Sequence, residues 1–151
     1  MLDSDLLSPS RILTGIRISS KKRLLELISQ TLANKNRHLS SREIFESLCA
    51  REHLGSTALG NGVAIPHGRI SNTKDVQALF LQLAKPLPFD AENGEPVDLL
   101  FPLVVPENCT EDHSKLLTSI IDRFSNSEIL ESLRNASDAN EIWQLLSGSH
   151  T

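Results

Sequence analysis

The chain of 151 residues has few cysteines, no excess of basic charge and no long apolar run. Its two cysteines, Cys49 and Cys109, are far apart and form no C-x-x-C motif. Isolated thiols are typical of a reducing compartment, so we expect a cytoplasmic protein without a disulfide. The N-terminus has no basic region followed by an apolar segment, so we expect no signal peptide.

The charge balance argues against nucleic acid as a partner. Lysine and arginine number 15 against 19 aspartates and glutamates, a formal net charge of −4, whereas proteins that grip a phosphate backbone usually have a basic excess. The apolar stretch 99–105 is interrupted by Pro102 and is too short to cross a bilayer. We therefore expect no membrane insertion.

The remaining composition is that of an ordinary folded domain. Hydrophobic residues make up 39% of the chain and charged residues 23%, which argues against disorder. The length is close to the commonest domain size, and no repeat or long linker divides the sequence. We predict a single domain spanning residues 1–151.

Apolar periodicity predicts alternating strands and helices. The predicted strands cover residues 12–18, 63–65, 76–83 and 97–105, with a loop at 85–96. The first predicted helix covers residues 21–34. This alternation favours an α/β sandwich with a largely buried sheet. Pro102 removes a donor from the last strand and indicates an edge or a bulge.

Capping residues mark the starts of the later helices. Ser40 and Glu43 form a capping box, beside a hydrophobic staple of Leu39 and Ile44. Three further helices are predicted to begin at the capping residues Thr110, Ser125 and Asp138. The buried stripe expected on the first of these three consists of Leu116, Leu117, Ile120, Ile121 and Phe124.

The glycine-rich segment 54–69 contains the candidate chemistry. Asn61-Gly62 predicts a hairpin turn. Pro66 restricts the backbone and presents His67 at a strand tip, while Gly68 leaves room for an approaching group. A neutral imidazole is a competent nucleophile. An isolated Pro-His-Gly, however, is more often a turn whose histidine bonds a backbone carbonyl.

Other residues favour the nucleophile. His113 falls at the third position of the helix that Thr110 is predicted to cap, where free amide groups and the helix dipole favour an anion. Arg51, at the end of the second helix, offers a planar charged fork. Ser56 and Thr57 add hydroxyl donors. Together with the histidine above, these residues predict a phosphoryl-binding pocket.

Competing chemistries have weaker support. A metal site of His53, His67 and His113 lacks a close ligand spacing such as H-E-x-x-H, and we expect no metal or cofactor. A nucleotide P-loop needs Gly-Lys-Ser/Thr, and a serine hydrolase needs G-x-S-x-G. The sequence contains neither.

The segment 55–68, GSTALGNGVAIPHG, resembles the phosphorylation-site signature of fructose/mannitol-type enzyme IIA domains of the bacterial phosphotransferase system (PTS). The resemblance extends over nearly the whole chain, and residues 20–28 and 88–101 look most like the nitrogen-regulatory branch. It implies an α/β fold with a mixed β-sheet sandwiched between helices on both faces. Pro102 departs from the family pattern within an apolar run.

The resemblance also implies roles for single residues. His67 matches the histidine that is phosphorylated, on Nε2, by an HPr-like histidine-phosphocarrier protein. His113 matches the second active-site histidine, which supports the phosphoryl group, and Arg51 matches the active-site arginine. Ser56, Thr57 and Gly68 remain candidates for the phosphate pocket. No metal or nucleotide is required by this scheme.

Docking of such a partner requires an exposed surface, for which we predict an apolar rim of Leu54, Leu59 and Ile70. Three functions remain in view. The chain is a nitrogen-regulatory phosphoryl carrier whose state is read by regulatory target proteins, a sugar-specific enzyme IIA that passes phosphate to a IIB domain, or a non-catalytic binding module. The polar cluster of Arg51 and the two histidines argues against the last.

Overall fold

The computed structural model describes residues 6–108 and 111–147, and the side chains of residues 111–113 are also outside this description. A short 3-10 helix, Pro9–Arg11, precedes the first strand. The strands are β1 (Ile12–Ile16), β2 (Ala58–Gly60), β3 (Val63–Ala64), β4 (His67–Ile70), β5 (Gln77–Ala78), β6 (Phe80–Leu87), β7 (Val97–Leu100) and β8 (Leu103–Pro106). The helices are α1 (Lys21–Lys35), α2 (Ser41–His53), α3 (Glu111–Arg123), α4 (Ser127–Asn135) and α5 (Ala139–Leu146).

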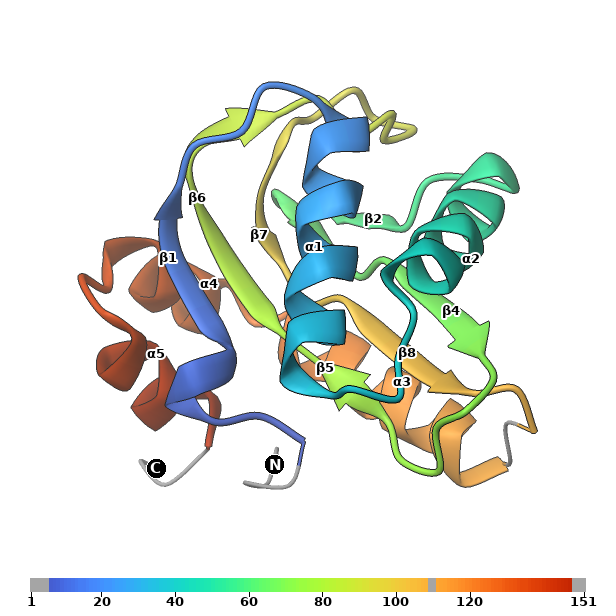
Figure 1. Ribbon diagram of the computed structural model, residues 1–151. Helices are drawn as coiled ribbons and strands as arrows, with labels where there is room; N and C mark the ends of the chain where they lie inside the picture. Colours follow the sequence, from blue (N-terminus) through green and yellow to red (C-terminus); the bar gives the residue numbers. More distant parts are fainter. Residues whose placement is uncertain (1–5, 109–110, 148–151) are drawn as a thin grey trace.

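Two sheets form the centre of the fold. One has the order β1-β6-β7-β3-β2 and the other the order β4-β8-β5. Both are mixed, since β1 runs parallel to β6 while β6 and β7 are antiparallel, and β8 pairs in parallel with β4 and antiparallel with β5. In Figure 1, α1 and α2 lie in front of the sheets and α3, α4 and α5 behind them. The predicted α/β class, a mixed sheet between helices, is confirmed.

Each face of the sheets packs against its helices through a separate apolar cluster. The front cluster contains Leu24 and Ile28 of α1 and Leu48 of α2, all fully buried. The rear cluster contains the buried Phe124, whose ring lies 6.0 Å from that of Phe80. Burying one such side chain contributes about 1.5–3 kcal/mol, so these clusters hold the layers together. No helix among the described residues has the length and apolar character needed to span a membrane.

Chain segments cross from the large sheet to the small one at two prolines. Pro66 separates β3 from β4, and Pro102 separates β7 from β8. The two crossings lie side by side, because the Leu103 N–H donates to the Pro66 carbonyl at 2.9 Å. The prediction of one strand over 97–105 was therefore wrong. A proline cannot donate to a sheet, and here it stands where the strand changes partners.

The predicted strand 76–83 is also divided, into β5 and β6 at Leu79. The Leu79 N–H donates to the Pro102 carbonyl at 3.1 Å, so this break faces the one at the proline. β6 then continues to Leu87. The strand therefore ends four residues later than predicted, and the loop predicted for 85–96 starts only after Leu87. Pairing of Leu87 with Val97 extends the strand through Pro86.

The caps confirm part of the sequence analysis. The Ser40 hydroxyl accepts from the Glu43 N–H at 3.2 Å, but the Glu43 carboxylate binds the N–H and hydroxyl of Ser71 and so ties α2 to the end of β4. Asp138 caps α5 as predicted, accepting from the Glu141 N–H at 2.9 Å.

Two expectations for the last third were wrong. Asn126, not Ser125, caps α4, because its side-chain oxygen accepts from two backbone N–H groups of the first turn. Ile121 is 36% exposed on α3, while its neighbour Ile120 is buried. The predicted cap Thr110 lies outside the described residues.

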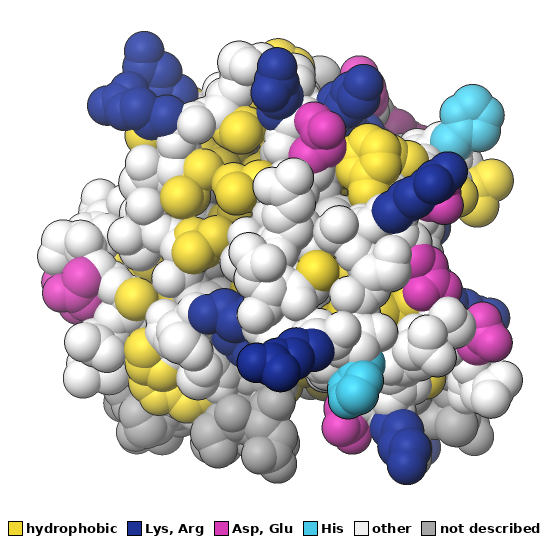
Figure 2. All heavy atoms as spheres, viewed as in Figure 1, with side chains coloured by type: hydrophobic (Ala, Val, Ile, Leu, Met, Phe, Trp, Pro, Cys, Tyr) yellow, Lys and Arg dark blue, Asp and Glu magenta, His cyan; other side chains and the backbone are white. Residues whose placement is uncertain are grey.

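Apolar side chains also reach the surface on the front face. Figure 2 shows them on the part of this face where β1 and α1 lie. Leu13 and Ile16 of β1 and Leu27 of α1 are partly buried. These side chains pack against the front cluster and close its outer edge.

Candidate active site

The segment 58–70 delivers the candidate nucleophile through a turn, two strands and a proline. Asn61 and Gly62 have φ values of 58° and 81°, the left-handed pair of a tight hairpin turn, as predicted. Val63 and Ala64 are both buried, because β3 pairs with β7 in the interior of the large sheet. His67 follows Pro66 and begins β4, so it stands at the start of a strand rather than at the strand tip predicted.

His67 lines an open pocket of about 480 Å³ between α2, β4, β8 and α3. The lining residues are Ser47, Ala50, Arg51, Leu54, His67, Gly68, Arg69, Leu103, Val105, Ser114 and Leu117. The structure therefore brings Arg51, His67 and Gly68 together from separate parts of the chain. The side chain of His113 lies outside the description, but its neighbour Ser114 on α3 lines this pocket.

A backbone carbonyl fixes the protonation of the His67 ring. Nδ1 lies 2.7 Å from the carbonyl oxygen of Ile65. A carbonyl only accepts, so Nδ1 carries the proton and Nε2 keeps its lone pair in the neutral ring. Nε2 has no hydrogen-bond partner among the described residues.

Burial lowers the pKa of His67 below its ordinary value, and the charge of Arg51 lowers it further. The bond to Ile65 and the charge of Glu52 act in the opposite direction. The net direction is downward, so the ring is neutral at pH 7. The half-buried imidazole thus combines the carbonyl bond expected of a turn histidine with the free nitrogen required of a nucleophile.

Arg51 carries an uncompensated charge at the pocket. Its Nη1 donates to the Gly55 carbonyl at 2.9 Å, and within the described part of the chain it forms no ion pair with a carboxylate. A guanidinium held by one neutral acceptor keeps further N–H groups for an anion. The arrangement is suited to a phosphoryl group.

The two predicted hydroxyl donors are bound elsewhere. The Ser56 hydroxyl donates to the Phe89 carbonyl at 2.7 Å and accepts from the Ala58 N–H. Thr57 is buried, and both its hydroxyl and its N–H donate to the carboxylate of Glu52. Neither residue lines the pocket, so the structure gives both a part in fixing the loop.

Gly68 is required for a different reason from the one the sequence suggested. A Cβ atom there would overlap the Ser47 side chain and lie 3.2 Å from a backbone carbon of α2. The space in the direction of a Gly68 side chain is thus filled by α2, while the Gly68 backbone still lines the pocket. The close approach is reinforced by the Ser47 hydroxyl, which donates to the Arg69 carbonyl at 2.8 Å.

Two residues near the site, Glu52 and Lys21, were not among the candidates predicted from the sequence. The Glu52 side chain is only 5% exposed and lies 3.0 Å from the Lys21 ammonium group, which also rests over the Phe89 ring. One signal was available: a carboxylate in the last turn of a helix opposes the helix dipole and needs a specific partner. The partners themselves come from distant segments.

Two of the three residues predicted for an apolar rim around His67 are exposed, and one of them, Leu54, lines the pocket. Leu54 is 82% exposed and lines the pocket, and Leu59 is 41% exposed. Ile70 is 1% exposed and belongs to the front cluster, so its inclusion was wrong. Its place on β4 turns it inward, toward the helices.

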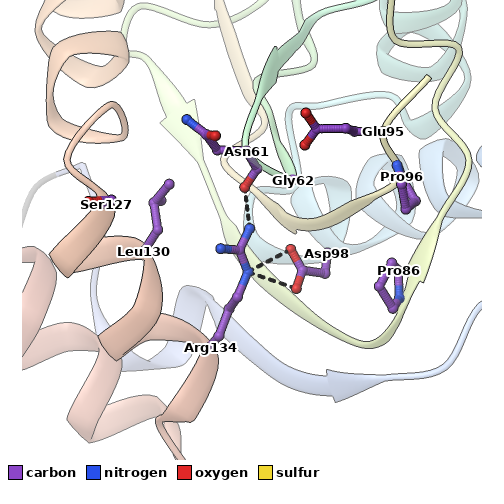
Figure 3. A pocket seen from close by; sticks show the side chains of 9 residues that line it. All are labelled: Asn61, Gly62, Pro86, Glu95, Pro96, Asp98, Ser127, Leu130 and Arg134. Atoms are coloured by element: carbon purple, nitrogen blue, oxygen red, sulfur yellow. Dashed lines mark hydrogen bonds and ion pairs between the residues drawn. The ribbon is translucent and has the colours of Figure 1, made fainter. Parts of the chain in front are cut away.

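A second pocket, of about 400 Å³, lies at the other end of the same segment. Figure 3 shows Arg134 of α4 reaching across to Asp98 and to the backbone of the Asn61-Gly62 turn. Its Nε lies 2.9 and 3.0 Å from the two Asp98 oxygens, and its Nη2 donates to the Asn61 carbonyl. Nε and Nη2 of this arginine thus hold Asp98 and the turn. Among the described residues, no group of three or more His, Cys, Asp or Glu side chains could hold a metal ion.

The chain matches a known family over most of its length. The family described as "Phosphoenolpyruvate-dependent sugar phosphotransferase system, EIIA 2" matches residues 5–149. The nitrogen regulatory protein of Pseudomonas aeruginosa is 43% identical over 141 residues, which cover 93% of this chain and 92% of that protein.

Two further relatives separate the branches of the family. The crystal structure of nitrogen regulatory protein IIA-Ntr from Neisseria meningitidis superposes with a TM-score of 0.88 at 43% identity, covering 94% of this chain and 97% of that one. The 2-O-alpha-mannosyl-D-glycerate-specific EIIABC component of Escherichia coli is 32% identical over 132 residues, which cover 86% of this chain but 20% of that protein. Similarity is therefore greater to the two nitrogen regulatory proteins.

Proposed function

The chain belongs to the EIIA 2 family of the PTS, and we propose that it is a phosphoryl carrier of the nitrogen-regulatory type. It accepts a phosphoryl group from an HPr-like histidine-phosphocarrier protein onto His67. One observation carries the proposal: the Ile65 carbonyl fixes the Nδ1 proton, so that a neutral ring, whose Nε2 has no partner among the described side chains, lines the same pocket as Arg51.

The transfer step follows from this geometry. The lone pair of His67 Nε2 attacks the phosphorus of the donor phosphohistidine. A new P–N bond forms as the donor P–N bond breaks, and the electron pair of the broken bond returns to the donor imidazole. Phosphoryl transfer needs mainly positioning and charge stabilisation, and the free N–H groups of Arg51 provide the latter. Donor and product are both phosphoramidates, so the step is close to thermoneutral and reversible.

His113 is proposed to support the phosphoryl group from the opposite wall. Its backbone lies in the first turn of α3, and Ser114 and Leu117 of the same helix line the pocket. Free N–H groups at the start of a helix favour an anion there.

The greater identity to nitrogen regulatory proteins favours regulation over sugar uptake. We propose that regulatory target proteins distinguish the phosphorylated from the unphosphorylated form. The alternative is a sugar-specific enzyme IIA that passes phosphate to a IIB domain. Incubation of the phosphorylated chain with a IIB domain tests this, since rapid loss of label to that domain would favour the alternative.

The central experiment uses phosphoenolpyruvate, the first enzyme of the PTS and an HPr-like carrier. We expect one acid-labile, base-stable phosphate per chain. His67→Ala should carry none, with its fold verified by circular dichroism. Label that persists in the variant would exclude His67 as the acceptor.

The rim is proposed as the docking surface for the carrier. Leu59→Glu should raise the KM for the phosphocarrier roughly tenfold, because a charge then replaces apolar area in the contact. Gln30→Glu adds the same charge on an exposed position of α1 and should leave KM unchanged. Equal effects of the two variants would assign the change to overall charge instead of the rim.

A further inference from the structure

Hydrogen bonds connect the interior of the protein to the imidazole of His67 in one continuous series. The Lys21 ammonium group lies 3.0 Å from the Glu52 carboxylate. That carboxylate accepts from the N–H of Thr57 at 3.2 Å and from its hydroxyl. The Thr57 carbonyl accepts from the Ile65 N–H at 3.2 Å, and the Ile65 carbonyl accepts from His67 Nδ1 at 2.7 Å.

Glu52 is the centre of this series, because its carboxylate binds Lys21 of α1 and Thr57 of the loop that follows α2. It extends from the last turn of α2 into the protein, 5% exposed, while its neighbour Arg51 extends to the pocket. Both oxygens of the carboxylate are used, by Lys21 and by the two donors of Thr57. A buried carboxylate is costly unless every such bond is made, so the loop has one favourable position against the helix.

The bonds between Glu52 and Thr57, which we call the Glu52 clamp, also influence the position of Arg51. The guanidinium donates to the Gly55 carbonyl, two residues before Thr57, and the Gly55 N–H donates to the Glu52 backbone carbonyl at 3.1 Å. The bonds of Thr57 to the Glu52 carboxylate therefore act together with this backbone bond to hold the carbonyl that orients the arginine. The two residues that face the pocket are thus held by one carboxylate that does not line it.

We propose that Glu52 is a positioning residue: by clamping Thr57 it holds the Ile65 carbonyl on His67 Nδ1 and the Gly55 carbonyl on Arg51, so that Nε2 and the guanidinium are preorganised for phosphoryl transfer. The inference rests on the proposed function. It concerns catalytic geometry, because Glu52 lies inside the fold and does not form part of the exposed rim.

The expected signature is a fall in kcat without a change in KM. Misplacement of reacting groups by about 1 Å costs up to about 100-fold in rate. We expect Glu52→Ala to approach this loss and Thr57→Val, which removes only the hydroxyl, to lose about tenfold. Thr57→Ser keeps the hydroxyl and should restore most of the rate.

Nuclear magnetic resonance on the unphosphorylated protein tests the proposal directly, because it measures the protonation of the His67 ring. The nitrogen shifts of His67 report the fraction of rings protonated on Nδ1, which we expect to be dominant in the native chain and reduced in Glu52→Ala and Thr57→Val. The Glu52 charge raises the His67 pKa, so that pKa should fall in Glu52→Gln. Glu46→Gln is the matched control, an exposed glutamate on α2 paired with Arg42, and should change neither quantity.

The outcomes separate this inference from the proposed function. Absence of label in the native chain, or label persisting in His67→Ala, would refute the phosphoryl carrier. A labelled native chain whose Glu52→Ala and Thr57→Val variants keep the native kcat and ring protonation would refute the positioning role alone. If Glu52→Ala does not fold, Thr57→Val decides, because its N–H still reaches the carboxylate.

Discussion

Arg134 lines the pocket at one end of segment 58–70 and Arg51, together with Arg69, lines the pocket at the other end, and Arg134 and Arg51 are in opposite states. Arg134 is neutralised by Asp98 and bonded to the backbone of a turn. Arg51 is bonded to one carbonyl and has no carboxylate partner among the described residues. The difference teaches that a neutralised arginine fixes structure, whereas an arginine with free N–H groups beside a neutral imidazole is available to an anion.

The largest effect is expected from removing the arginine that has free N–H groups, Arg51. Arg51→Ala should lower the rate of His67 phosphorylation by about 100- to 1,000-fold, the usual cost of removing one donor to a developing charge. Thermal melting should change little, since the side chain makes a single bond to an exposed loop. Arg51→Lys, which keeps the charge without the planar fork, should recover only part of the rate. A rate unchanged in Arg51→Ala would refute the assigned role.

The next effect concerns how close α2 lies to β4. Gly68→Ala places a methyl group on Ser47 and against the helix backbone, which should cost about 1–3 kcal/mol of unfolding free energy. Urea denaturation measures this. The double variant with Ser47→Gly should lose less than the sum of the two single variants, because the collision is shared. Strict additivity would show that the contact is not the cause.

A smaller loss of stability is expected at the other pocket. Arg134→Ala leaves the Asp98 carboxylate and the Asn61 carbonyl without their donor, and should lower the free energy of unfolding by about 1–2 kcal/mol. The phosphorylation rate should stay within about twofold, as this end of the segment does not reach the nucleophile. Arg42→Ala, which removes an exposed pair with Glu46, is the control and should cost about 0.5 kcal/mol or less. A rate loss as large as that of Arg51→Ala would erase the distinction between the pockets.

The smallest effect is the response of the transfer rate to pH. The pKa of His67 lies below the ordinary value of about 6.5, so the ring is already neutral above that pH and the rate should be flat from about pH 8 to 7. The rate should fall only on further acidification, as the folded-state pKa is approached. A decline centred above about pH 7 would contradict the lowered pKa.

The same shift affects stability. The folded state binds the His67 proton more weakly than the unfolded state does. The free energy of unfolding should therefore decrease as pH falls below the ordinary histidine pKa toward the folded-state pKa of His67. His67→Asn removes this site and should flatten that part of the stability profile, which denaturation at pH 7 and pH 5 measures.

Much of the fold was predictable wherever the signal lies in neighbouring residues. The Ser40 and Asp138 caps and the Asn61-Gly62 turn were predicted because each involves bonds within a few positions. The apolar face of α1 follows from periodicity alone. Ser125 failed as a cap because Asn126 next to it competes for the same N–H groups.

In the candidate site, too, the residues with a local sequence signal were predicted and those that depend on contacts with other segments were not. The motif around His67 marked the proposed nucleophile, and the helix end marked Arg51, since both signals are local. The clamp by Glu52 was missed, because its partners Lys21 and Thr57 lie on a different helix and in a loop. Ser56 and Thr57 were assigned to the pocket from their proximity in sequence, yet their hydroxyls are bonded away from it.

By itself, the sequence determined the family, the α/β class, the starts of several helices and the candidates Arg51 and His67, which both line the pocket. These depend on side-chain periodicity, backbone restrictions and short motifs, all of which act over a few residues. Only the tertiary structure decided that strands change sheets at Pro66 and Pro102, that Ile70 turns inward, and which arginine is neutralised. Those outcomes depend on which distant segments meet, and the balance of burial and charge at such contacts is set only when the layers pack.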